Sequence, residues 1–286
     1  MNLLSWIIFI VGIVIIPLLF RSFIMPKKLR QKPVYALITA ATFTLIGFVA
    51  SFFIFSSAIS IVMIAFSSLL MLPYVMKVLE PEKKKKKKSS LRHIQKDIWS
   101  LKSWYRVFQE HDKVVLFYIF LFFGMALEYT LLFALLPPGI SDAAFSQQLE
   151  FLGPAGSLFN AGLFWKIIEN NIQILLICFA FSIFYGAGSI FVLNYNASIV
   201  GVIYGMGIKT MIWGGSAGVF ANPLIFLPHT ILEVLAYLLA AMGGGILSKD
   251  PNDPEIQKDT MIIFLISLLI VFLAGFVEVT FPMLFM

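Results

Sequence analysis

The chain has 286 residues, of which 60% are hydrophobic and 13% are charged, with a formal net charge of +6 and a mean hydropathy of +0.93. A soluble domain of this size needs about 25% charged residues to cover its surface, so the composition excludes a soluble globular protein. The single cysteine, Cys178, lies in an apolar run, which excludes an internal disulfide and a multi-cysteine metal site.

Apolar windows of about 18 residues or more are long enough to cross a bilayer as helices. The candidate windows are 3–24, 33–55, 58–79, 113–136, 171–194, 197–214, 223–247 and 260–284. The expected fold class is therefore all-α, a polytopic transmembrane helix bundle of about eight spans. The first window has no basic residue before it and no small-residue cleavage site after it, so we interpret it as a retained span.

The sixth window, residues 197–214, is short, rich in glycine and contains Lys209. This composition suits either a tilted span or a re-entrant hairpin enclosed by protein. Asn194 and Asn196 are expected to turn the chain between the fifth and sixth windows, and the YGAGS sequence to interrupt the fifth near its middle. The glycines expected at close helix contacts are Gly186, Gly188, Gly201, Gly205 and Gly244.

Lysine and arginine predict the orientation, because they are enriched in cytoplasmic loops. When eight spans are drawn with both termini outside, only Lys166 and Lys209 of the 21 basic residues fall on the outer side. The sequence thus predicts a multi-pass protein of the cell membrane with both termini extracytoplasmic. The longest outer loop, residues 137–170, is expected to form short helices at the membrane interface.

Three regions are expected along the chain: a three-span region over 1–80, a basic cytoplasmic linker over 81–112, and a second membrane domain over 113–286. The linker carries the lysine run Lys83–Lys88, followed by apolar residues at helical spacing with bases between them. This pattern favours a topogenic linker with an amphipathic helix on a leaflet of anionic lipid headgroups. Nucleic acid is not expected as a partner of a membrane-tethered chain.

Three carboxyl groups lie inside apolar windows, those of Glu128, Glu233 and Glu278. The expected topology places all three in the outer half of the bilayer, where His229 and Lys209 also fall, so one shared polar cluster is plausible. His229 and Glu233 are four residues apart and therefore lie on one face of a helix.

These polar groups allow three interpretations. A Glu233–Lys209 pair, or protonated glutamates bonded to neighbouring helices, would fix helix packing. A proton or ion pathway is the second interpretation. Catalysis is the weakest, because PHTILE lacks the second histidine of a H-E-x-x-H zinc site, and His93 and His111 fall on the inner side. We therefore predict no catalytic residue, metal or cofactor.

The carboxy-terminal part of the chain contains a set of motifs that occur in a fixed order. They are Asn170–Asn171, FYGAGSIFVLNYNASIVGVIYG, LPHTILEVLAYLLAAMGGG, and an acidic residue in the last span. In these motifs the chain resembles the archaeal-type members of the stage II sporulation protein M family, except that Thr230 stands where the family commonly has glycine. The residues that match the family's core are Asn171, Gly186, Asn196, Gly201, Pro228, His229, Glu233 and Glu278.

The resemblance covers about residues 110–286 and implies a membrane component of an envelope-remodelling complex. In endospore formers the family member anchors stage II sporulation proteins D and P, and the enzymes of the complex are its partners. For this chain the resemblance implies a non-enzymatic scaffold whose partner is a membrane or envelope protein or a second copy of itself. The alternatives are a proton-coupled transporter or channel, and an intramembrane hydrolase with a nucleophile such as Ser182 beside His229.

Overall fold

The computed structural model describes residues 32–55, 58–79, 100–152, 161–214 and 226–280. All elements in these ranges are α-helices, and seven of them are long and apolar enough to cross a membrane. These seven are α4 (Pro33–Ile54), α5 (Ile59–Leu79), α6 (Leu101–Leu135), α9 (Ala161–Tyr185), α10 (Ile190–Trp213), α11 (Leu227–Leu247) and α12 (Pro254–Thr280). The prediction of an all-α polytopic membrane protein is confirmed, while the expected span 3–24 lies outside the described residues.

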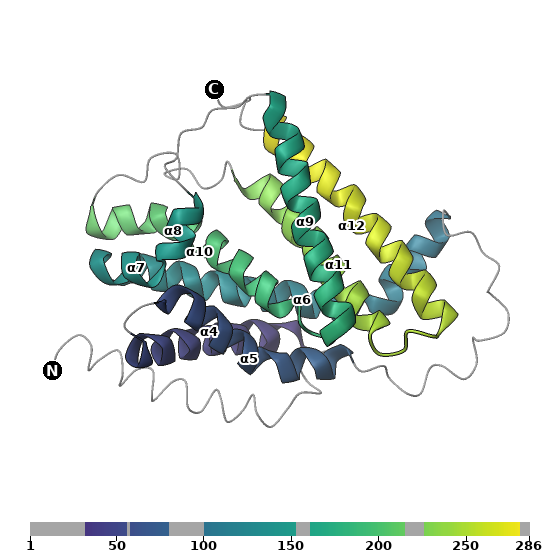
Figure 1. The fold of residues 1–286 in the computed structure, drawn as a ribbon, viewed down its shortest axis with the longest axis horizontal. Coiled ribbons are helices and arrows are strands. Elements are labelled where there is room, and N and C mark those ends of the chain that lie inside the picture. Colours follow the sequence, from purple (N-terminus) through teal and green to yellow (C-terminus); the bar gives the residue numbers. More distant parts are fainter. Residues whose placement is uncertain (1–31, 56–57, 80–99, 153–160, 215–225, 281–286) are drawn as a thin grey trace.

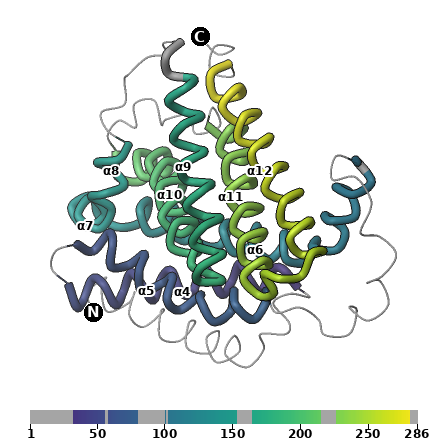
Figure 2. The backbone as a smooth tube through the Cα atoms, turned by 45° about the vertical axis from the view of Figure 1, so that its right-hand side comes forward, coloured from purple at the N-terminus to yellow at the C-terminus, as the bar shows by residue number. Residues whose placement is uncertain are grey.

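The long helices form two groups (Figure 1). A four-helix group contains α4, α5, α6 and α10, and a three-helix group contains α9, α11 and α12. Figure 2 shows the three-helix group running at a steep angle to α4 and α5. The helices α4 and α5, from the expected amino-terminal region, thus pack directly against α6 and α10 from the expected second domain.

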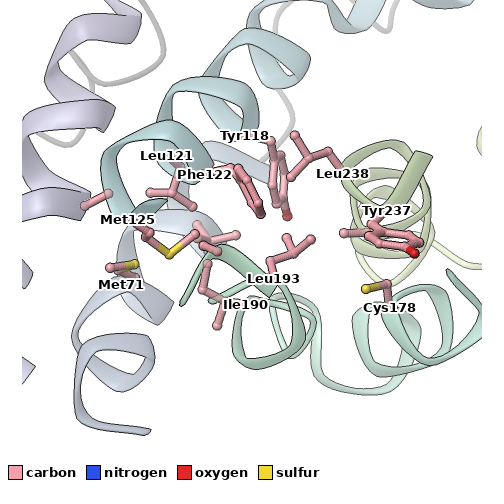
Figure 3. Close-up of a cluster of buried hydrophobic side chains, with 14 of the residues drawn as sticks. Met71, Tyr118, Leu121, Phe122, Met125, Cys178, Ile190, Leu193, Tyr237 and Leu238 are labelled. Atoms are coloured by element: carbon pink, nitrogen blue, oxygen red, sulfur yellow. The ribbon is translucent and has the colours of Figure 1, made fainter. Parts of the chain in front are cut away.

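The hydrophobic core continues from one group into the other (Figure 3). At the junction, Tyr118 of α6 and Leu193 of α10 face Leu238 of α11, and Cys178 of α9 lies beside Tyr237. Each of these side chains is at most 3% exposed. The two groups are therefore joined by a close-packed apolar interior.

The turn between the fifth and sixth expected spans was predicted wrongly. It lies at residues 186–189 rather than at Asn194 and Asn196, and the YGAGS sequence ends α9 instead of interrupting it. Gly186 has a φ of 67°, a left-handed conformation that glycine adopts at little cost. Asn194 and Asn196 lie inside α10, because their side chains find hydrogen-bond acceptors within the bundle.

The sixth expected segment, residues 197–214, lies almost entirely within α10, a continuous helix of 24 residues, so it is not a re-entrant hairpin. Its glycines lie against α6: a Cβ atom on Gly201 would come within 2.5 Å of the Cβ of Tyr129, and one on Gly205 within 3.1 Å of Phe133. The glycine content reflects close approach of two helices, not an interrupted backbone.

The last residues of the expected linker are also part of a long helix. α6 has 35 residues, roughly 52 Å, and runs without a break from Leu101 to Leu135. Residues 101–112 therefore extend a transmembrane helix instead of forming a separate surface helix. Arg106 Nη2 donates to Asp259 Oδ1 at 3.2 Å, and His111 Nε2 lies 3.8 Å from Oδ2, so α12 holds this extension in place. Lys83–Lys88 lie outside the described residues.

The outer loop forms short helices, as expected, and these pack against the four-helix group. Two short helices, α7 (Pro138–Ala144) and α8 (Ser146–Leu152), run back along the four-helix group. Ser60 Oγ donates to the carbonyl oxygen of Ala144 at 2.8 Å, and Gln148 Nε2 donates to Ser198 Oγ at 3.0 Å. A buried donor on α5 and a buried acceptor on α10 thus hold this segment against the four-helix group. Residues 161–170, also expected as an interfacial helix, are the first turns of α9.

Candidate functional site

Charged and polar side chains mark two ends of the molecule. We call the end that carries Arg106 and Asp259 the basic end, and the opposite end the carboxylate end. On α12, Asp259 and Glu278 are 19 positions apart, about 28 Å along the axis. Asp259 and Glu278 therefore lie near opposite ends of α12.

Four polar residues from the three-helix group form what we call the carboxyl cluster: Asn171 of α9, Glu233 and Tyr237 of α11, and Glu278 of α12. Asn171 Nδ2 donates to Glu233 Oε1 at 2.6 Å, and the Tyr237 hydroxyl donates to Asn171 Oδ1 at 2.8 Å. The carboxyl groups of Glu233 and Glu278 lie next to each other. One set of polar contacts thus joins all three helices near the carboxylate end.

The bonding in the carboxyl cluster defines its chemistry. Two carboxyl groups placed side by side repel each other when both are ionised, so the Glu233–Glu278 pair favours a bound proton or a nearby cation. The Tyr237 hydroxyl occupies the amide oxygen of Asn171, which orients the amide nitrogen toward Glu233. The cluster can therefore bind a proton or a cationic group.

A polar strip on α9 leads to the carboxyl cluster from the surface. Its exposed residues are Lys166, Glu169, Asn170 and Gln173. Asn170 Nδ2 contacts the Oδ1 atom of the buried Asn171 at 3.4 Å. The cluster is therefore one side chain away from the exposed surface at the carboxylate end.

His229 lies one helical turn from Glu233 on the same face of α11, further toward the carboxylate end. Its side chain is packed against the ring of Phe226 and is only 8% exposed. The Nδ1 atom is buried and has no hydrogen-bond partner. A buried polar atom without a partner is costly, so this nitrogen is a candidate hydrogen-bonding contact for a ligand.

Glu128 and Lys209 do not join the carboxyl cluster. Both lie in the four-helix group, where Lys209 donates to Ser141 Oγ and, at 3.0 Å, to Asp142 Oδ1 of α7. The expected Glu233–Lys209 pair is therefore not formed. Glu128 lies on α6 beside the buried Tyr129. Glu128 and Lys209 lie apart from the carboxyl cluster because their helices, α6 and α10, belong to the four-helix group. The carboxyl cluster belongs to the three-helix group of α9, α11 and α12.

A second polar network lies inside the four-helix group, and its centre, Asn194, was not among the predicted site residues. Asn194 Nδ2 donates to Ser67 Oγ at 2.7 Å and to Ser68 Oγ at 2.9 Å, and its Oδ1 accepts from the Tyr129 hydroxyl at 3.0 Å. Asn196, which was predicted, donates to the carbonyl of Val192 in its own helix. The serine pair inside an apolar window was the signal that could have revealed this network.

The arrangement of Ser182 bears on the hydrolase interpretation. Ser182 Oγ donates to Ser189 Oγ at 2.7 Å, and its Cβ lies against Gly244 of α11. Gly244 is 15 residues, about 22 Å, from His229 along α11, so Ser182 does not lie beside His229. Within the described ranges, no three His, Cys, Asp or Glu side chains are grouped to hold a metal ion.

Comparison with known proteins gives two matches. The profile of the stage II sporulation protein M family matches residues 113–281, which contain every residue of the carboxyl cluster. An uncharacterized protein of Methanocaldococcus jannaschii is 30% identical over 132 residues, covering 41% of this chain and 68% of that protein. No solved structure matches the chain.

Proposed function

Because this chain belongs to the stage II sporulation protein M family, we propose that it is a non-enzymatic membrane scaffold that holds partner proteins of the cell envelope. The chain is a multi-pass membrane protein with seven apolar helices among its described residues. Membership of the family suggests a role in a process of the cell envelope. The polar contacts inside the helix groups favour an anchoring role over a transport role.

One observation carries this choice. On α11, every residue from Leu238 to Gly245 is buried and apolar. This stretch separates the carboxyl cluster from the basic end by about 12 Å of helix. A proton or ion pathway needs polar or hydrated groups across the whole membrane. In the three-helix group the residues of the carboxyl cluster instead contact one another at one end, as interhelical polar contacts do in a rigid bundle.

The proposal includes an orientation in the cell membrane. The part of α6 at the basic end carries Lys102, Arg106 and Lys113, and basic residues favour the cytoplasmic side. The carboxylate end then faces the extracytoplasmic side, where a partner of the envelope is accessible.

The test is affinity purification from native membranes after cross-linking, followed by mass spectrometry. Wild type is compared with the double variant His229→Ala/Glu233→Ala and with the control Asn196→Ala, whose side chain bonds only within α10. We expect one discrete membrane or envelope protein with wild type and control, and its loss from the double variant, which must retain its helical circular dichroism. An intact wild-type protein without a partner that conducts protons in liposomes would contradict the proposal.

A further inference from the structure

The polar strip on α9 occupies one face of a membrane helix. Its four exposed residues are Lys166, Glu169, Asn170 and Gln173. Side chains three, four and seven positions apart lie on the same side of an α-helix, so the strip faces away from α11 and α12, against which α9 packs. Neither Lys166 nor Glu169 forms an ion pair within the described ranges.

Two contacts fix the level of the polar strip relative to α12. A Cβ atom on Gly275 would lie 2.5 Å from Cδ1 of Ile168, and the ring centroids of Phe179 and Phe264 are 4.6 Å apart. From the first contact to the second, the residue number rises by 11 on α9 and falls by 11 on α12. The two helices therefore run antiparallel in a constant register, and the polar strip is level with residues 270–277 of α12.

At this level α12 has an exposed surface of the opposite character. Its exposed residues are Phe272 (44%), Leu273 (51%) and Phe276 (61%). These side chains suit lipid and would form an unfavourable apolar patch in water, whereas exposed charges and amides suit water and are costly in lipid. No charged residue lies between Asp259 and Glu278, so lipid surrounds α12. The polar strip at the same level therefore needs a cover.

The polar strip is complementary to a second copy of itself. Lys166 and Glu169 have opposite charges and lie three positions apart, about 4.5 Å along the helix axis. In a two-fold symmetric contact between parallel α9 helices, Lys166 of each copy can reach Glu169 of the other, and the two ion pairs form reciprocally. The amides of Asn170 and Gln173 carry both donors and acceptors, so each can bond to its own counterpart across the axis.

The exposed face of α9 continues beyond the polar strip with apolar side chains at the same spacing. Leu176, Ile177 and Phe181 are each between 43% and 46% exposed. Such a row can pack against its counterpart on a second helix, while the polar residues at one end determine the register.

We propose that two copies of this chain associate through the outer faces of their α9 helices, with the polar strip at the contact. Lys166 of each copy pairs with Glu169 of the other, so both charges leave the lipid and both are balanced. The inference goes beyond the scaffold function and does not depend on the identity of the scaffold's partner.

The experiment measures association of the full-length protein in phosphatidylcholine vesicles. Energy transfer is recorded between copies labelled with donor or acceptor at Asn252→Cys, an exposed site in the α11–α12 turn. We expect wild-type transfer to rise with the protein-to-lipid ratio. Lys166→Glu makes the strip acidic and Glu169→Lys makes it basic, so each variant places like charges against each other and should weaken self-association at least about tenfold.

Mixing the two variants separates a contact between copies from an effect within one chain. The acidic and the basic copy should associate with each other within about threefold of wild type, because the ion pairs form again between unlike copies. An ion pair within one chain cannot produce this preference. The control Lys102→Glu reverses an exposed charge on α6 and should associate like wild type.

Wild type without concentration-dependent transfer, or transfer that the single variants leave unchanged, overturns the inference. Weaker self-association of both variants without recovery on mixing also overturns it, and with helical circular dichroism retained would mean that the strip binds a different protein. If either variant loses its helical circular dichroism, Asn170→Cys provides the test. Mild oxidation should join two Asn170→Cys copies by a disulfide, but not two Phe272→Cys copies at the same level of α12, and equal yields contradict the proposed contact.

Discussion

Two asparagines that lie two residues apart in α10, on different faces of the helix, have different roles. Asn194 is fully buried and bonds to α5 and α6, while Asn196 bonds to the carbonyl of Val192 in its own helix. An amide that joins three helices fixes their register, because a shift of one residue would break its bonds at once. An amide that bonds within its own helix has no such effect.

This difference predicts unequal costs of substitution. Asn194→Leu leaves the Tyr129 hydroxyl without its acceptor and Ser67 and Ser68 without their donor, so it should reduce the free energy of unfolding by about 1–2 kcal/mol. The control Asn196→Leu should change it by less than about 0.5 kcal/mol. Thermal unfolding in detergent, followed by circular dichroism, measures both free energies of unfolding. Equal losses in the two variants would show that the interhelical bonds of Asn194 do not stabilise the protein.

Glu233 tests the bonding of the carboxyl cluster. Glu233→Gln keeps an oxygen for the Asn171 amide, and its own amide nitrogen can donate to the neighbouring Glu278 carboxyl group, so the melting temperature should stay close to wild type. Glu233→Ala removes both bonds and should cost about 1–2 kcal/mol. Identical melting of the two variants in detergent would count against interhelical bonding at this position.

At the scale of elements, glycine allows α9 and α11 to approach each other closely. A Cβ atom on Gly244 would lie 2.4 Å from the carbonyl oxygen of Phe179 and 2.8 Å from the Cβ of Ser182. Neither neighbour is the end of a flexible side chain, so the helices themselves would have to move apart.

We therefore expect Gly244→Ala to destabilise the protein by about 1–3 kcal/mol. Gly139→Ala is the matched control, because a Cβ atom there meets nothing within 4 Å. Chemical unfolding in mixed micelles gives both values. A Gly244→Ala protein as stable as wild type would mean that α9 and α11 are further apart than described.

The positions of the helices could be predicted where a run of apolar residues determines them. They could not be predicted as well where hydrogen bonds between side chains of different helices determine them. The α4, α5, α11 and α12 spans follow from runs of apolar residues alone. The turn at 186–189 was misplaced because asparagine favours turns in isolation, and only the three-dimensional partners of Asn194 reveal that it is helical. Lys209 was likewise grouped with the glutamates by depth, while its partner Asp142 comes from a loop whose fold no hydropathy pattern indicates.

At the scale of the whole molecule, the orientation can be tested with single cysteines. Gly139→Cys lies in α7 at the carboxylate end, and Asn252→Cys lies in the exposed α11–α12 turn at the basic end. A membrane-impermeant maleimide should label Gly139→Cys in intact cells and Asn252→Cys only after lysis. The native Cys178 is 0% exposed and should not react. The reverse labelling pattern would invert the proposed topology.

The order of helices along the chain crosses between the two groups. After α4, α5 and α6 of the four-helix group come α9 of the three-helix group, then α10 of the first, then α11 and α12 of the second. During synthesis, Tyr129 and Ser67 therefore enter the membrane before Asn194 exists, and α9 enters before α11 supplies Glu233. Neither group can finish assembling until a later helix has passed the ribosome, so the two halves mature together as one cooperative unit.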